Sequence, residues 1–252
     1  MKSNSNRPNS TKKIHNVLVA MLSAEPKWYV RKEIVKTYQS LKPRNGAADL
    51  IAAYDGQDDR VKRAIIGALR EYETDEVKLF LLDVIENEQN DYLVSSALSA
   101  LIKIDLDAAK EKFDWAMEQE SHSETIRSAA LGILTEEKSD SNLATLKEMA
   151  VYGAAPYNLR GSIFRRIANY REEHPDLIDY FADHINDKSR SVRGICANQI
   201  IRHGSVEQFA DVLEMADGEP LRGGRIADIY AALDSRLAKL KKSKKRKGAR
   251  EV

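Results

Sequence analysis

The chain has 252 residues, and its 40 Lys and Arg nearly balance its 39 Asp and Glu, which leaves a net charge of +1. Its one cysteine, Cys196, excludes a disulfide within the chain. The polar N-terminus lacks the apolar run of a secretory signal, and no apolar stretch is long enough for a membrane span. These features predict a cytoplasmic protein.

The balanced net charge hides two basic ends. Residues 239–252 carry +7 and residues 1–13 carry +4, so the remaining residues 14–238 carry −10. We predict disordered basic tails at 1–13 and 241–252. The acidic body is expected to disfavour wrapping of nucleic acid, because phosphate contacts need cations along the groove. The C-terminal tail is expected to make only weak contacts with nucleic acid or an anionic surface.

One nine-residue pattern recurs along the chain at spacings of 31 to 33 residues. Its copies are VRKEIVKTY from Val30, VKRAIIGAL from Val61, VSSALSALI from Val94, IRSAALGIL from Ile126, LRGSIFRRI from Leu159 and VRGICANQI from Val192. In each copy the first, fifth and ninth residues are apolar or small, except for Tyr38, and this spacing places them on one face of a helix. A fixed period of this length is typical of stacked helical hairpins.

Each copy is therefore predicted to be the second helix of a hairpin. The first helices are predicted at 12–22, 45–54, 75–88, 106–119, 140–151, 175–186 and 205–216. A seventh, less regular hairpin is expected from Ser205 to about Leu240. The predicted fold class is all-α, a right-handed α-solenoid of about seven hairpins over residues 14–240. Cys196 falls on the core face of its helix, where a buried, unreactive thiol is expected.

The second residue of each copy is basic in all copies but one, where it is Ser95. Two interpretations stay open for these cations. A long cation can reach a carboxylate or carbonyl of a neighbouring hairpin and form a ladder between repeats, and the ladder candidates are Arg31, Lys62 and Arg127. The same row can instead bind a ligand, and the candidates for partner binding are Arg160 and Arg193.

Aromatic residues stand just before several of the second helices. Trp28 and Tyr29 precede Val30, and the other two such residues are Tyr92 and Tyr157. Corresponding positions of stacked hairpins line up along one edge, so these rings either bind a partner protein or peptide or fill gaps between repeats.

The sequence contains no complete set of catalytic or metal-binding residues. The histidines are scattered, and none forms the His-Glu-x-x-His pair of zinc peptidases. No glycine-rich phosphate loop or Gly-x-Ser-x-Gly elbow is present. We therefore assign no catalytic residue, no metal ligand and no cofactor to this chain.

The repeated copies resemble the second helices of HEAT repeats, with their Val-Arg start. Several segments are similar to the C-terminal HEAT-repeat region of bacterial-type zinc aminopeptidases of the aminopeptidase N family. They are AEPKWYVRKEIVK, NDYLVSSALSAL, SHSETIRSAALGIL, YGAAPYNLRGSIFRRIANY and RSVRGICANQI. In that family the helical region covers the active site, and the zinc motif lies upstream. The resemblance implies a non-catalytic lid or scaffold that binds protein or peptide on its concave surface, with zinc only in a separate catalytic domain.

Other functions stay open beside this one. The chain is alternatively an independent protein-binding scaffold, a nucleic-acid-binding solenoid like the HEAT-like DNA glycosylases, or a phycobilin-lyase-like protein. A zinc aminopeptidase catalytic domain is one candidate partner, and enzyme activity is expected only if such a domain is fused or supplied.

Overall fold

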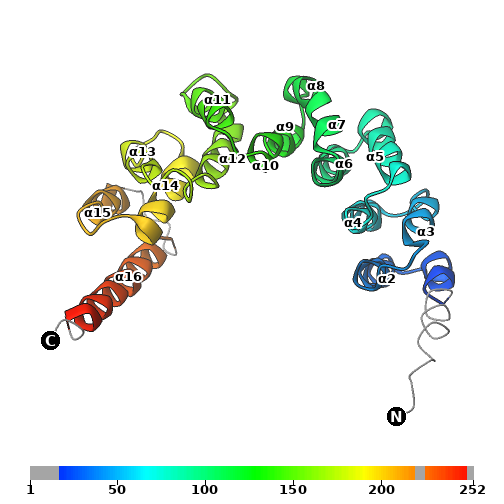
Figure 1. Cartoon of the computed structure of the whole chain (residues 1–252), viewed down its shortest axis with the longest axis horizontal. Helices are drawn as coiled ribbons and strands as arrows, with labels where there is room; N and C mark the ends of the chain where they lie inside the picture. The colour runs from blue at the N-terminus through cyan, green and yellow to red at the C-terminus, as the bar shows by residue number, and fades with distance from the viewer. Residues whose placement is uncertain (1–16, 219–224, 249–252) are drawn as a thin grey trace, which may run out of the picture. The chain divides into compact units, whose positions relative to one another are not determined.

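The computed structural model describes residues 17–218 and 225–248, and all regular secondary structure within these ranges is helical. The chain divides into two compact units, Met1–Glu137 (unit 1) and Lys138–Val252 (unit 2). Each unit is a stack of helical hairpins (Figure 1), which confirms the predicted all-α solenoid class. The handedness of the complete array stays a prediction.

Unit 1 begins with a helix over residues 17–24 and then alternates between the two helices of each hairpin. Its second helices are α2 (Trp28–Leu41), α4 (Asp59–Leu69), α6 (Asp91–Ile104), and α9 (Thr125–Ala130) with α10 (Ile133–Glu136). Its further first helices are α3 (Gly46–Ala52), α5 (Asp75–Asn87), and α7 (Leu106–Glu111) with α8 (Phe113–Glu118). A short 3₁₀ turn, η1 (His122–Glu124), leads into α9.

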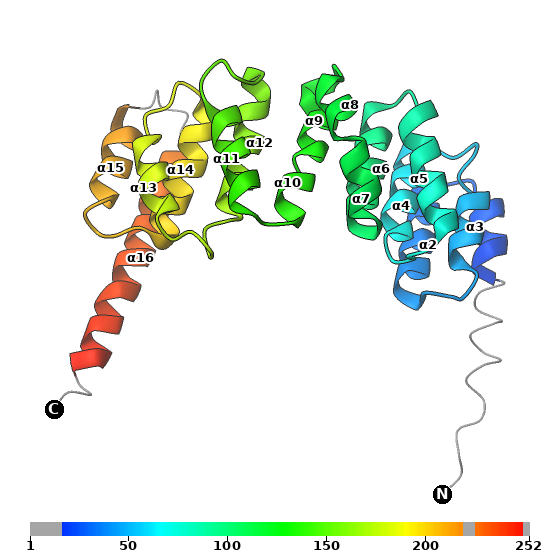
Figure 2. The ribbon, with the colours of Figure 1, turned by 45° about the horizontal axis from the view of Figure 1, so that its top comes forward.

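Unit 2 repeats this plan. Its first helices are α11 (Asp140–Ala150), α13 (Leu177–Asp183) and α15 (Phe209–Gly218), and its second helices are α12 (Tyr157–Ala168), α14 (Arg190–His203) and α16 (Arg225–Gly248). Within each unit the second helices pack against one another and form one layer, while the first helices form the other (Figures 1 and 2). The predicted positions of the hairpins are thus confirmed over the described residues.

The predicted apolar stripe forms the core between the two layers. Val61, Ile65 and Leu69 of α4 have no exposed surface, and all corresponding residues of the other copies are buried except Val30, which is partly buried. A second stripe, one residue after the central position of each copy, joins the core through residues such as Ile66 and Phe164. A hairpin has apolar residues on both faces of its second helix because it packs against a first helix and a neighbouring hairpin.

Two helices that the sequence predicts as continuous are interrupted. The fourth second helix stops at Ala130 and resumes at Ile133, and its Gly132 N–H donates to the carbonyl of Ala129, 2.8 Å away, instead of one residue further back. Glycine costs about 1 kcal/mol relative to alanine inside a helix, so the break falls at the weakest point. The predicted helix 106–119 is likewise divided at Lys112.

The ends of the chain differ from the prediction in one respect. Helix α16 runs on to Gly248, whereas the sequence predicts that a disordered tail starts at residue 241. The predicted N-terminal tail, residues 1–13, lies outside the described residues. The domain limits at 13 and 240 therefore stay predictions.

Two helical glycines provide a matched test of this packing. A Cβ added at Gly67, inside α4, would meet no atom within 4 Å, whereas a Cβ added at Gly46 would overlap the hydroxyl of Tyr72 and lie 2.9 Å from its Cζ. We expect Gly67→Ala to stabilise the chain by about 0.5–1 kcal/mol through helix propensity. Gly46→Ala should destabilise it by about 1–3 kcal/mol through overpacking. Urea denaturation followed by circular dichroism measures both, and effects of the same sign would contradict the packing described here.

Candidate interaction surfaces

The basic residue near the start of a second helix connects that helix to the segments around it. Nε of Arg31 donates to the backbone oxygen of Glu25, and its Nη1 donates to Oε1 of Gln57 over 2.8 Å. Glu25 lies before α2 and Gln57 lies before α4, so one side chain joins the connectors of two neighbouring hairpins. Nζ of Lys62 lies 3.1 Å from Oε2 of Glu88, which precedes α6, and repeats this link one hairpin later.

The pattern changes in the next two hairpins. Ser95 replaces the cation, and its hydroxyl donates to the carbonyl of Tyr92 in the same helix at 3.1 Å. Arg127 keeps its contacts within its own hairpin, where Nε donates to the carbonyl of Met117 at 2.7 Å and Nη1 donates to Oε2 of Glu124 at 2.7 Å. The role of Arg127 is therefore to hold α9 against the end of α8.

Arg160 makes the most enclosed of these connections. Its side chain is only 2 % exposed, and its guanidinium forms a bidentate pair with the carboxylate of Asp187 at 2.6 and 2.8 Å. Nη2 also donates to the carbonyl of Ala150, the last residue of α11, at 3.0 Å. Arg193 completes the cluster by donating from Nη1 to the backbone oxygen of Asp187 at 2.7 Å. One arginine thus ties three consecutive elements of unit 2 together.

This geometry corrects the assignment of Arg160 and Arg193 to partner binding. The guanidinium of Arg160 is buried and fully engaged, so it cannot reach a second molecule without breaking a buried ion pair. Arg193 is partly buried and bonded to two backbone carbonyls. Both therefore resemble Arg31, Lys62 and Arg127, whose side chains bond to connectors or helix ends, and we call these five residues the connector cations.

The acceptors of the connector cations were not identified from the sequence. A periodic signal exists for three of these acceptors, because each of the three lies in a connector 26 or 27 residues after its cation. The pairs are Arg31 with Gln57, Lys62 with Glu88 and Arg160 with Asp187. The acceptor is an amide in one copy and a carboxylate in the others. Its regular spacing is therefore recognised only after the cations of the copies have been aligned.

The pKa values of two groups near Arg160, the carboxyl of Asp187 and the thiol of Cys196, are shifted. Burial alone raises the pKa of Asp187, but the bonds from Arg160 and from the N–H of Ser189 outweigh it, so the pKa lies below its usual range. Burial also raises the pKa of the Cys196 thiol to about 12. Cys196 has no exposed surface, which confirms the predicted buried, unreactive thiol.

The aromatic residues predicted at the helix starts are exposed. Trp28, Tyr29 and Tyr92 are 36 %, 50 % and 44 % exposed in unit 1, and Tyr157 is 55 % exposed in unit 2. The rings do not fill gaps in the core. In unit 1 the residues at this position alternate between aromatic and acidic along adjacent second helices, in the order Trp28, Asp59, Tyr92 and Glu124.

Contacts between neighbouring hairpins run along this row, which we call the aromatic edge of unit 1. The guanidinium of Arg60 lies 4.3 Å from the centre of the Trp28 ring, and the Tyr92 ring lies 5.9 Å from the imidazole of His122. The amide of Asn90 donates to Asp59 over 2.8 Å. The exposed rings are therefore held on an ordered edge.

Charge is separated between the two layers of each unit. Every first helix outside residues 17–24 has a net negative charge, from −1 for α3, α7 and α11 to −3 for α5 and α15. The second helices α2 and α4 each carry +2, α12 and α14 each carry +3, and α16 carries +7. Residues 14–137 account for −8 of the −10 of the body. The net charge of the body therefore does not describe each layer, because the first helices hold an excess of acids and several second helices hold an excess of bases. The expectation that the acidic body disfavours wrapping of nucleic acid stays a prediction.

The described residues contain no group of three His, Cys, Asp or Glu side chains placed to hold a metal ion. None of the helices drawn within residues 17–218 and 225–248 is long and apolar enough to cross a membrane.

Comparison with known families identifies one match. Residues 16–102 match the family model for HEAT repeats, and this range corresponds to the first three hairpins of unit 1. No curated protein matches the chain, so that comparison lends no support to the resemblance with zinc aminopeptidases.

The contribution of the connector cations to stability can be tested with a buried arginine, Arg160, and a partly exposed one, Arg127. Arg160→Met should lower the free energy of unfolding by about 3–5 kcal/mol, because Asp187 would remain buried without its partner. Arg127→Ala should cost about 1–2 kcal/mol, since it removes carbonyl and carboxylate bonds at a partly exposed site. Chemical denaturation measures both, and an equal or reversed order would contradict the burial argument.

The same pair predicts a dependence on pH. Because the folded pKa of Asp187 is depressed, its contribution is fully present above the unfolded value of about 3.9 and is lost as the pH falls through the lower folded value. The stability difference between wild type and Arg160→Met should therefore be largest near neutral pH and shrink below a pH of about 4. Urea midpoints across this range provide the measurement, and a gap independent of pH would rule out the Asp187 pair as its cause.

Proposed function

We propose that this HEAT-repeat protein is a non-catalytic interaction module that binds a protein or peptide along the aromatic edge of unit 1. HEAT repeats generally act as scaffolds for protein interactions. The observation that carries the proposal is the exposure of Trp28 and Tyr29 at the start of α2 and of Tyr92 at the start of α6, on either side of α4. Tryptophan and tyrosine are the side chains most enriched among binding hot spots.

The chemistry of this edge specifies the kind of partner. Acidic side chains alternate with the rings, and Asp59 and Asp91 both accept hydrogen bonds from neighbouring repeats. A segment with basic and apolar residues complements such a surface, since opposite charges guide association and aromatic rings contribute the buried contact.

A narrower form of the proposal concerns the identity of the partner. The segments that resemble zinc aminopeptidases favour a catalytic domain of that family, over which this chain would act as a lid. This form depends on the resemblance alone. The broader alternative is a scaffold for a partner unrelated to peptidases, and the same experiment separates the two.

The test is affinity purification from native extract with the tagged chain, high-salt washing and mass spectrometry. Wild type is compared with the double variant Trp28→Ala/Tyr92→Ala and with Leu79→Ala, a control residue that is 65 % exposed on α5 of the other layer. We expect wild type and Leu79→Ala to retain the same protein, and the double variant to lose at least about tenfold in recovery, because hot-spot truncations cost about 2 kcal/mol or more.

Equal recovery with all three chains would exclude the aromatic edge as the binding surface. A retained partner that carries His-Glu-x-x-His supports the lid, and one without this motif rules it out. The variants are expected to change the free energy of unfolding by less than about 1 kcal/mol, because the rings are exposed. Chemical denaturation of each variant checks that loss of the partner is not caused by unfolding.

A further inference from the structure

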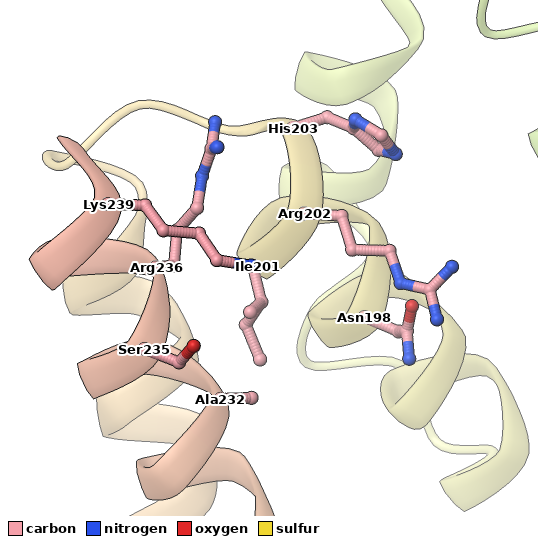
Figure 3. A pocket seen from close by; sticks show the side chains of 8 residues that line it. All are labelled: Asn198, Ile201, Arg202, His203, Ala232, Ser235, Arg236 and Lys239. Atoms are coloured by element: carbon pink, nitrogen blue, oxygen red, sulfur yellow. The ribbon is translucent and has the colours of Figure 1, made fainter. Parts of the chain in front are cut away.

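A cleft in unit 2 has a different chemistry from the aromatic edge. It lies between α14 and α16 and has a volume of about 490 Å³. Figure 3 shows the residues that line it, which are Asn198, Ile201, Arg202 and His203 from α14 and Ala232, Ser235, Arg236 and Lys239 from α16. These side chains offer cations and hydrogen-bond donors, beside apolar surface from residues such as Ile201 and Ala232.

The cations of this cleft have no counter-charge among the described residues. None of the residues that line it is acidic. The side chains of Arg202, Arg236 and Lys239 form no hydrogen bond or ion pair with the part of the chain that the structure describes. The connector cations of the same unit, by contrast, are bonded to carboxylates or carbonyls. Evidently the cations of the cleft are not needed to hold the repeats together.

One polar atom of the cleft is both buried and unsatisfied. Nε of Arg236 is shielded from solvent and has no hydrogen-bond partner within the described ranges. A buried donor without an acceptor costs roughly 1–3 kcal/mol, and charged donors cost more. A bound anion could accept a hydrogen bond from this atom and would remove the cost. An exposed lysine, whose donors are already hydrated, gains nothing comparable from an anion.

The pKa of His203, which also lines the cleft, is affected by the positive charges around it. Partial desolvation and the charges of Arg171, Arg202 and Arg236 lower the pKa of His203. Three arginines of unit 2 thus lie close enough to His203 to make the potential around it more positive. Such a region attracts anions.

The arrangement suits an extended anion better than a single one. In Figure 3 the guanidinium groups of Arg202 and Arg236 point in different directions from the two walls and do not converge on one point. Helix α16 continues beyond the cleft with a sequence that gives the whole helix a charge of +7, and α14, which packs against it, carries +3. Spaced cations along a continuous layer match the regular spacing of phosphates on a nucleic acid backbone.

We propose that the cleft between α14 and α16 binds the phosphate backbone of a nucleic acid through Arg202, Arg236 and Lys239. Asn198 and Ser235 supply neutral donors of the kind that position a backbone. Contacts to the phosphate backbone carry no sequence information, so binding of this kind is independent of base sequence. It lies in unit 2, and it involves none of the residues of the aromatic edge.

The test is fluorescence anisotropy of the full chain with a fluorescein-labelled DNA duplex of roughly two helical turns, measured over a series of salt concentrations. Arg202→Gln/Arg236→Gln is compared with Arg44→Gln/Arg70→Gln, a control that removes the same charge from exposed arginines of unit 1. We expect the cleft variant to bind roughly tenfold more weakly and the slope of log K against log salt to fall by about two, one for each lost phosphate contact. The control should bind within about twofold of wild type.

A third variant, Lys244→Gln/Lys245→Gln/Lys247→Gln, separates the cleft from the lysine-rich end of the chain. Loss of binding in this variant alone, with the cleft variant equal to the control, would overturn the proposal. Absence of duplex binding by wild type would also overturn it. So would binding of wild type to phosphatidylserine vesicles without binding to DNA, since the cleft would then serve a lipid surface. Circular dichroism of each variant confirms the fold.

Discussion

A helical hairpin with apolar residues on two faces of one helix cannot fold alone, because it must lay one of those faces against a neighbour. This constraint determines most of what is observed in the chain. Stacking brings the polar connectors of consecutive hairpins against the helix starts, where backbone carbonyls at helix ends need donors. The connector cations supply them, and Arg160, bonded to both Ala150 and Asp187, does so from a fully enclosed position. Helices, connectors and cations are therefore parts of one arrangement.

The sequence was sufficient to predict the hairpins because their signal is periodic. Apolar residues at every fourth position placed each second helix correctly, and Cys196 fell where the pattern required a small buried residue. The interruption at Gly132 was not predicted, since helix propensity is a weak effect that packing can override in either direction.

The contacts of individual cations were harder to predict. Arg160 and Arg127 occupy the same position of their repeats, yet one is buried with a carboxylate 27 residues later and the other bonds only within its own hairpin. Which of these occurs depends on the connector, whose length and acceptors vary among repeats. The aromatic edge, in contrast, followed directly from position, because residues before the helix start lie outside the core stripe.

Net charge proved to be a poor guide to surface chemistry. A body of −10 suggested a uniformly acidic surface, but first helices hold the excess of acids and second helices hold the bases. Each helix exposes only one polar face. The charged residues of the first helices therefore determine the charge of one layer, and those of the second helices determine the charge of the other. The cations that line the cleft between α14 and α16 lie in unit 2, while the aromatic edge lies in unit 1. Two distinct surfaces follow from one repeated pattern.

The central claim is that connector cations hold neighbouring repeats together locally, and hydrogen exchange measured by mass spectrometry tests it most directly. Stability in a repeat array is nearly a sum of local contributions. In Arg160→Met the account predicts that amides of α11, α12 and α14 lose protection while those of α2, α4 and α6 keep it. Equal loss of protection in all helices, or no loss anywhere, would contradict it.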